Sequence, residues 1–352
     1  MSRARRDAMM IEASVSDAVK HDNVQELEQT LRQTEVDELV LVCGMMHAAQ
    51  VGSVQCLQAL LRHGLDPNTN DLMFGETALM KGSRQGNIQV IDYLISQNCY
   101  VNARAESNGE SALHVAVRNR QIGSLERLIA VPNINLNIMD KQGRTPLMVA
   151  AIYADPPIIS VLLGAGCDPN RFSFGGLAAI HHALNPRWQT SGYINAGENL
   201  TALLNAGISP DMCDENGQTP IHYAINVNNI KAVKLLIHYN CNVNWAVGRP
   251  KMTPVMASLK RLNLRVAKIL QAAGCHFQGT LSFLSDEAFL RPSGATCRQW
   301  LEAQLAKPIS LKSSCRHAIR QRLGHFPWRS VEYLPLPKTL REYVLMSEVR
   351  TL

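Results

Sequence analysis

A sequence pattern that returns about every 34 residues constrains the fold of this 352-residue chain more than any other feature. Each copy opens on a Thr, Ser or Ala, as in GETALMKGSRQGN, GESALHVAVRN and GRTPLMVAAIY. A constant period of this length is typical of repeat proteins, in which each copy packs mainly on its neighbours. The opening residues are separated by 34, 34, 33, 41 and 34 positions; they are Thr77, Ser111, Thr145, Ala178, Thr219 and Thr253.

The residue types within each copy predict two short helices. Thr77 or its equivalent caps the first helix, and a Pro that follows it is tolerated in the first turn. Small residues at 149–151 let the two helices approach closely. The second helix carries an apolar ridge that one copy cannot bury alone, so stacked copies are expected to share one elongated core. The ridge is illustrated by Val233, Leu235, Leu236 and Ile237, and the turn glycines by Gly75, Gly109, Gly143 and Gly217.

The period, the Thr-Pro-Leu-His-like opening and the Asp-x-Asn-like close resemble the ankyrin repeat. The close is visible in LISQNCYVN, LLGAGCDPN and LLIHYNCNVN. Copies run from about residue 43 to 277, and a degenerate one is expected at 17–31. The resemblance implies an all-α ankyrin-repeat solenoid of about seven to eight helix-turn-helix repeats at 13–277, after a basic N-terminal tail at 1–12.

Two sets of reactive residue types fall on repeat positions, and we interpret them as structural. Stacked equivalents lie about 10 Å apart, too far for one zinc ion with thiolate bonds of about 2.3 Å. The repeated cysteines therefore favour small packing residues over a metal or redox cluster; they are Cys99, Cys167, Cys241 and Cys275. The repeated histidines are expected to bond the neighbouring turn rather than to do acid–base chemistry; they are His114, His181 and His222.

Composition and motifs favour a folded binding protein over an enzyme. Hydrophobic residues make up 46% of the chain, and the net charge of +6 does not by itself indicate nucleic-acid binding. We see no apolar run of about 18 residues and no hydrolase, zinc-protease or phosphate-loop motif. We therefore expect no catalytic residue, metal, cofactor, membrane or nucleic acid.

The nine cysteines, without a secretion signal ahead of them, favour a reducing compartment. We therefore expect the protein in the cytosol, with the nucleus as an alternative. Arg3, Arg5 and Arg6 could mark localisation, but a solvated terminus is the preferred interpretation.

The period is broken in the fifth copy, which is longer by about eight residues. The surplus falls at 185–199, in NPRWQTSGYINAGEN. Insertions in repeat proteins often emerge on the binding face, and Trp and Tyr are frequent interface anchors. The alternative is that these aromatic side chains fold back onto the repeats. The expected substrate-binding residues are Phe172, Phe174, Trp188, Tyr193 and Trp245.

After Phe277 the repeat stops, and residues 278–307 predict a capping helix or linker that ends at Pro308. Trp300 and Leu301 would cover the apolar face of the last repeat, because terminal repeats need such a cover.

Residues 308–352 carry two motifs in a defined order. The first places an apolar residue at every fourth position, which makes one ridge on an α-helix. The second, Leu-Pro-Leu-Pro, favours an extended segment before a short final helix. Together they resemble the SOCS box, a small three-helix module. The ridge is formed by Leu311, Cys315, Ile319 and Leu323, and the second motif comprises Leu334, Pro335, Leu336 and Pro337, followed by Leu340 and Tyr343.

Taken together, the chain resembles the ankyrin-repeat and SOCS-box proteins. The resemblance implies that the ridge binds elongin C, which brings elongin B, and that the second motif selects cullin-5 with its RING subunit. The chain would then present an unidentified protein substrate for ubiquitination and catalyse nothing itself. The alternatives are an ankyrin scaffold that sequesters a partner while its SOCS box serves stability, and a tail that merely packs on the last repeat.

Overall fold

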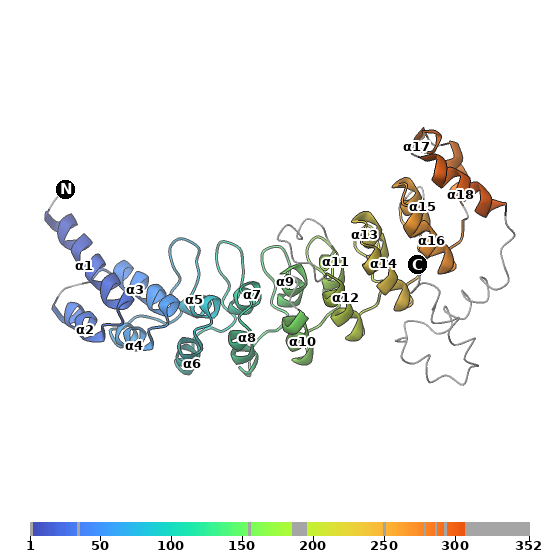
Figure 1. Ribbon diagram of the computed structural model, residues 1–352. Coiled ribbons are helices and arrows are strands. Elements are labelled where there is room, and N and C mark those ends of the chain that lie inside the picture. Colours follow the sequence, from blue (N-terminus) through green and yellow to red (C-terminus); the bar gives the residue numbers. More distant parts are fainter. Residues whose placement is uncertain are drawn as a thin grey trace. The chain divides into compact units, whose positions relative to one another are not determined.

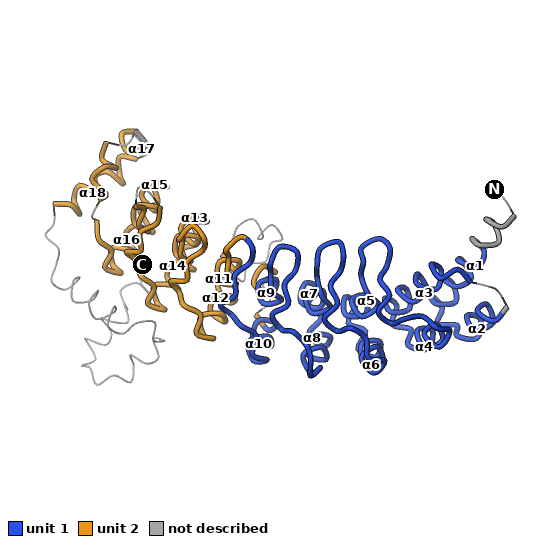
Figure 2. The backbone as a smooth tube through the Cα atoms, turned by 180° about the vertical axis from the view of Figure 1, so that it is seen from behind, with its two compact units in different colours: residues 1–150, 157–174 blue, residues 151–156, 175–352 orange. Residues whose placement is uncertain are grey.

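The computed structural model describes residues 3–33, 36–153, 156–184, 196–248, 251–277, 279–285, 287–291 and 294–306. Within these ranges the secondary structure is helical, with two isolated antiparallel bridges, Asn70 to Thr77 and Val247 to Met252, and no strand. None of the helices found there has the length and apolar character needed to cross a membrane. The chain divides into two compact units, which Figure 2 colours separately: Met1–Ala150 with Pro157–Phe174, and Ala151–Pro156 with Gly175–Leu352.

Unit 1 consists of helical pairs stacked in two rows (Figure 1). Contacts run along the row of first helices, from α1 through α3 and α5 to α7, and along the row of second helices, from α2 through α4 and α6 to α8. The pairs are α1 (Arg3–Lys20) with α2 (Val24–Gln33), α3 (Glu38–Val51) with α4 (Val54–Arg62), α5 (Ala78–Gln85) with α6 (Ile88–Ser96), α7 (Ala112–Arg118) with α8 (Ile122–Ile129), and α9 (Pro146–Tyr153, as far as Ala150) with α10 (Pro156–Gly164, from Pro157).

Unit 2 repeats the arrangement. Its first helices are in contact from α11 through α13 to α15, and its second helices from α12 through α14 to α16. The pairs are α11 (Ala179–His182) with α12 (Ala196–Asn205), α13 (Pro220–Asn226) with α14 (Ile230–His238), and α15 (Pro254–Lys260) with α16 (Leu264–Ala272). The short helices η2 (Thr280–Ser285) and α17 (Glu287–Leu290) lead to α18 (Ala295–Leu305). The expected all-α ankyrin fold is therefore confirmed.

The repeat positions act at the helix starts as expected. The hydroxyl of Thr77 accepts a hydrogen bond from the Met80 amide, and Thr253 does the same for Met256. Pro220 and Pro254 occupy the first turn of their helices, where a missing amide proton costs nothing. These caps satisfy amides that a helix start would otherwise leave without a partner.

Three details differ from the sequence-based expectations. Helix α1 begins at Arg3, inside the segment 1–12 that we expected to precede the repeats, and pairs with α2 as the degenerate first copy. Helix α12 begins at Ala196, so the last residues of the expected insert 185–199 are helical, and Asn199 is buried with its amide 3.4 Å from the Ala151 carbonyl. Leu235, assigned to the buried ridge, is only half-buried, whereas Leu236 and Ile237 are buried.

Helix α18 covers the last repeat. Leu301 is fully buried, and the Trp300 ring meets Phe277 edge-on with 5.7 Å between ring centroids. Gln304 bonds Gln271 of α16 through the side-chain amides. The apolar surface of α16 is thereby protected at the end of the stack.

Candidate protein-binding surface

The loops that join consecutive repeats of unit 1 project beyond the row of first helices (Figure 1). We call their tips, residues 71–75, 106–109, 141–143 and 172–174, the finger row. Main-chain hydrogen bonds join each tip to the next. The amide of Ser107 donates to the Phe74 carbonyl at 3.0 Å, Lys141 to Asn108 at 2.9 Å, and Phe174 to Gln142 at 3.1 Å. The finger row is therefore one continuous structure rather than four separate loops.

Glycine is required where one tip meets the next. Gly75 and Gly143 have φ values of 64° and 74°, which side chains resist. A Cβ at Gly143 would lie 2.5 Å from the Phe174 amide nitrogen, and one at Gly75 would lie 2.7 Å from the Glu106 amide nitrogen. The close approach of the fingers thus depends on the absence of a side chain at these positions.

The first finger presents an apolar tip. Leu72 is 78% exposed and Met73 is 83% exposed, while the Phe74 ring lies 5.8 Å from the Lys81 ammonium group. An exposed apolar cluster of this kind on a folded protein often marks an interaction site. Our sequence reasoning missed this tip, although a signal existed: the loop reads DLMFG where the next two loops read AESNG and DKQG.

The fourth finger places two of the predicted substrate-binding residues on the surface. Phe174 is 73% exposed and Phe172 is 44% exposed. The Phe174 ring lies against the third finger, since a Cβ at Gly143 would be 2.7 Å from its Cγ atom. The exposure that the prediction needs is present at both residues.

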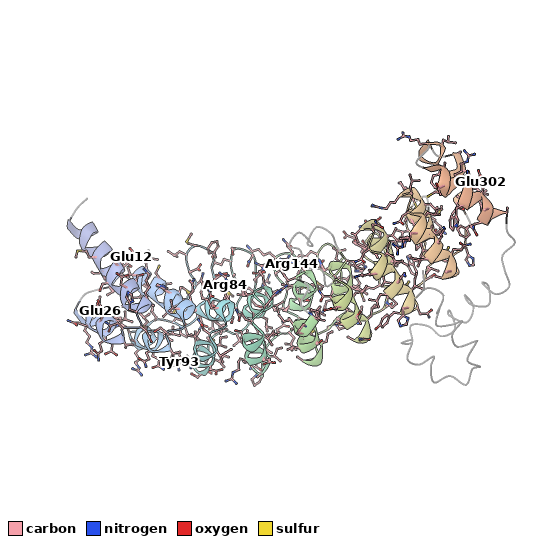
Figure 3. All side chains as sticks on the ribbon, in the orientation of Figure 1. Glu12, Glu26, Arg84, Tyr93, Arg144 and Glu302 are labelled. Carbon is pink, nitrogen blue, oxygen red and sulfur yellow. The ribbon has the colours of Figure 1, made fainter. Side chains whose placement is uncertain are left out.

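Buried ion pairs form the base of the finger row. Lys81 lies 2.7 Å from both Asp71 and Glu76, and Arg84 also pairs with Glu76. Burial alone would lower the pKa of Lys81, but the hydrogen bonds that its ammonium group donates to the two carboxylates, together with their negative charge, outweigh it and raise that pKa. In Figure 3, Arg84 lies on the finger side of unit 1 and Tyr93 on the opposite side.

The next two repeats also carry ion pairs at the base of their fingers. Arg118 pairs with Glu110, whose pKa is raised because burial opposes the charged form more than the arginines favour it. One repeat later Arg144 occupies the position of Glu110 and pairs with Asp140 at 2.7 Å. These pairs hold charged groups beneath the tips.

The repeated histidines are structural, as expected. Nε2 of His114 lies 2.9 Å from the Arg144 carbonyl, and Nε2 of His181 lies 2.9 Å from the Met212 carbonyl. Burial lowers the pKa of His114 and of His222 to about 4. The imidazoles of His114 and His222 are neutral near pH 7. His114 and His181 each join a helix start to a loop.

The repeated cysteines are buried, and none belongs to a group of potential metal ligands among the residues that the structure describes. Burial raises the pKa of Cys99 to about 11 and that of Cys167 to about 12. Thiols of this kind are poor nucleophiles at neutral pH, which agrees with a packing role.

In unit 2, Trp245 is 37% exposed and its indole Nε1 donates a 3.2 Å hydrogen bond to the Gly217 carbonyl. This predicted substrate-binding residue therefore also joins two loops, in the way that main-chain bonds join the finger row. Trp188 and Tyr193 lie outside the described residues.

The predicted elongin- and cullin-binding residues all lie outside the described part of the chain, which ends at residue 306. They are Leu311, Cys315, Ile319, Leu323, Leu334, Pro335, Leu336, Pro337, Leu340 and Tyr343.

Comparison with protein families assigns the repeat region and the C-terminal segment to known families. A family model described as ankyrin repeats (3 copies) matches residues 45–140, 108–173 and 191–280, and thus more than half of the chain. A model described as SOCS box matches residues 307–345. The match to the ankyrin model covers the finger row except Phe174, and the match to the SOCS-box model covers every predicted elongin- and cullin-binding residue.

Similar individual proteins share only part of their length with this chain. They include an L-asparaginase of Dirofilaria immitis, 26% identical over 47% of this chain and 28% of that protein. The ANK repeat-containing protein nipk-1 of Caenorhabditis elegans is 27% identical over 38% of this chain and 25% of its own length. SH3 and multiple ankyrin repeat domains protein 1 of Homo sapiens is 32% identical over 38% of this chain and 6% of that protein. The chain thus spans less than a third of each of these relatives.

Proposed function

Because the chain belongs to the ankyrin-repeat and SOCS-box proteins, we propose that it is the substrate-recognition subunit of an elongin B/C–cullin-5–RING ubiquitin ligase. Ankyrin repeats imply protein binding, and a SOCS box implies an adaptor role towards elongins B and C and a cullin. One observation carries the proposal: a SOCS box at 307–345 follows ankyrin repeats in the same chain.

The proposed elongin contact is a helix that enters a groove. Leu311, Cys315 and Ile319 recur at the i, i+4 and i+8 positions that such a helix uses as anchors, with Leu323 one step further. Cys315 suits this ridge because a thiol is small and apolar. Supported by this spacing, we assign these residues to elongin C, with elongin B joining the complex.

The proposed cullin contact is the segment 334–337, with Leu340 and Tyr343 after it. Its prolines restrict the chain before binding, which lowers the entropy lost on association. The resemblance of Leu-Pro-Leu-Pro to the cullin-box pattern supports cullin-5 as the partner, together with a RING subunit.

The finger row is the surface that we propose for the target. It combines the apolar tip at Leu72 and Met73 with Phe172 and Phe174 and a base of paired charges. Apolar anchors surrounded by polar groups are typical of protein interfaces. Trp188, Tyr193 and Trp245 remain candidates for additional target contacts.

The proposed contribution to ubiquitin transfer is proximity. Holding a target near the activated ubiquitin raises its effective concentration without any chemistry by the receptor itself. The name of the asparaginase relative describes a protein of which the alignment covers 28%, and we assign no such activity to this chain. The proposed place of action is the cytosol, with the nucleus as the alternative.

The elongin contact is tested by co-purification of the full chain with elongins B and C. Leu311→Asp is expected to abolish capture, because a carboxylate on the ridge would be buried without a partner. Ser313→Asp adds the same charge two residues away, on the other side of the expected helix, and is expected to retain capture. Equal capture by both variants would refute the assignment of the ridge.

The target surface is tested by affinity capture from cells in which ubiquitin transfer is blocked. Leu72→Ser/Met73→Ser is expected to lose proteins that the unchanged chain captures, as is Phe174→Ser. Leu281→Ser/Leu290→Ser removes two exposed leucines of unit 2 and serves as the control. Ubiquitination of the captured proteins is then compared in cells with active transfer, with and without the chain. Ubiquitination that does not depend on the chain would instead favour a scaffold that sequesters its partner.

A further inference from the structure

The last repeats carry an uncompensated positive charge. Residues 216–285 contain no Asp or Glu, whereas the whole chain has 29 of them and a net charge of only +6. The basic residues of this segment are Lys231, Lys234, Arg249, Lys251, Lys260, Arg261, Arg265 and Lys268.

Four of these cations share one face of two neighbouring helices. Lys231 and Lys234 lie on α14, and Arg265 and Lys268 lie one repeat later on α16, which contacts α14. We call these four residues the basic face. The two helices bury matching positions, Ala232, Val233 and Leu236 on α14 and Val266, Ala267 and Leu270 on α16.

Because the buried positions match, the cations on both helices point away from the core in the same direction. Neighbours three apart on a helix are about 5 Å from one another, and packed helices are about 10 Å apart. Lys231, Arg265 and Lys268 are exposed and Lys234 is half-buried. No ion pair with any of the four occurs among the described residues. The basic face is therefore a compact cluster of cations open to a partner.

The repeat itself does not require cations at these positions. The equivalent pairs in the earlier second helices are neutral or acidic. They are Gln55 and Gln58, Gln89 and Asp92, Gly123 and Glu126, Pro157 and Ser160, and Glu198 and Thr201. The basic face thus belongs to the last two repeats alone.

Local electrostatics oppose two of these cations. Lys231 and Arg265 are the second residues of α14 and α16, where the partial positive charge of a helix start favours acidic side chains. Neither helix has an acidic residue in its first turn. Because cations at these positions do not stabilise the helices, their presence indicates a role in binding rather than in folding.

We propose that the basic face binds an acidic, carboxylate-rich segment of a partner protein. A protein partner follows from the proposed receptor function, on which this choice of class rests. Single-stranded nucleic acid would be expected to stack bases on exposed aromatic rings, and a membrane surface to receive apolar side chains. Among the described residues of 216–277, the one large apolar side chain that is exposed is Trp245, which belongs to a loop between repeats and not to α14 or α16.

The test uses the purified full chain and a fluorescent peptide of ten glutamates. Fluorescence anisotropy is expected to show binding that weakens as salt screens the charges. Lys231→Gln/Lys234→Gln/Arg265→Gln/Lys268→Gln is expected to raise the dissociation constant at least tenfold. Arg32→Gln/Arg62→Gln/Arg120→Gln/Arg171→Gln removes the same charge from exposed positions of unit 1 and is expected to change it less than twofold.

Folding is checked with Lys231→Gln/Arg265→Gln. This variant removes only the two unfavourably placed cations, so its melting temperature should not fall, while peptide binding should weaken. Equal weakening by the unit 1 control would overturn the proposal, because only net charge would then matter. Tighter binding of a charge-matched single-stranded oligonucleotide, or of vesicles containing phosphatidylserine, would overturn the choice of a protein partner.

The two proposals fail separately. If the peptide does not bind while elongin capture is intact, only the proposal for the basic face is refuted. If the peptide binds to a chain that does not capture elongins, the proposal for the basic face is supported and the ligase assignment is refuted.

Discussion

The Nε2 atom of His114 lies 2.9 Å from the carbonyl oxygen of Arg144. A buried imidazole at the start of α7 is therefore joined to the loop that leads into α9. A carbonyl accepts, so Nε2 carries the proton. Nδ1 is then the acceptor, 3.2 Å from the Ser111 amide and 2.9 Å from the Ser111 hydroxyl. Protonating Nδ1 would remove that acceptor, and the neutral ring is therefore part of the fold.

The free energy of unfolding should fall in mild acid because of this histidine. Burial lowers the pKa of His114 from 6.5 to about 4, so between these values the unfolded chain takes up a proton that the folded chain does not. Stability from this group is complete above about pH 6.5 and is lost as the pH falls through about 4, at about 1.4 kcal/mol per unit of pKa shift.

Urea denaturation at several pH values measures this effect. His114→Gln should be less stable at pH 7 and should lose less stability than the unchanged chain between pH 6.5 and 4. A slope unaffected by His114→Gln would show that the imidazole is not the group that titrates.

Gly143→Ala should destabilise the finger row by about 1 to 3 kcal/mol. The residue has a φ of 74°, and its Cβ would lie 2.5 Å from a backbone nitrogen that cannot move aside without breaking the row. Gly164→Ala is the control, because no atom lies within 4 Å of its Cβ position and alanine favours the helix that holds it. Thermal unfolding should show a lower midpoint for the first variant and an equal or higher one for the second.

Asn102→Ala should cost about 0.5 to 1.5 kcal/mol because it removes two hydrogen bonds between neighbouring repeats at exposed groups that water can then reach. The Asn102 side chain accepts from the Asn135 amide and donates to the Asn133 carbonyl, both at 2.8 Å. Asn102→Asp keeps the acceptor and should cost less, since Asp211 makes the equivalent bond to the Asn242 amide at 2.7 Å. Equal urea midpoints for the Ala and Asp variants would argue against the acceptor as the important atom.

Pro335→Ala/Pro337→Ala should weaken cullin-5 recruitment several-fold while elongin capture persists, because flexible residues raise the ordering cost of the contact. Pulldown of both partners from one reaction measures the ratio directly. Simultaneous loss of cullin and elongin would indicate that the substitutions unfold the SOCS box instead.

The fold was largely predictable because its information is local and repeated. Each Thr cap and turn glycine acts within a few residues, and the same local signals recur about every 34 residues. The errors arose where a helix end depends on packing. Residues 196–199 of the expected insert lie in α12, and Asn199 is buried beside Ala151, a contact that no local pattern contains.

The candidate surface was only partly predictable. Phe172 and Phe174 were found because they lie just before an insertion, whereas Leu72 and Met73 were overlooked because their copy has the regular length. Whether such a side chain faces solvent depends on the path of its loop. Trp245 is partly exposed and also hydrogen-bonded to Gly217, and this combination could be recognised only from the tertiary structure.

The sequence by itself determined the stacked helical pairs and the two ordered motifs of the C-terminal segment, because caps, turns and apolar periods act between near neighbours. Only the tertiary structure decided which residues meet across the repeats. Ser107 bonds Phe74, and Lys231 shares a face with Arg265, because the stacking of one pair on the next aligns positions about 34 residues apart. That alignment is a property of the packed core and not of any single repeat.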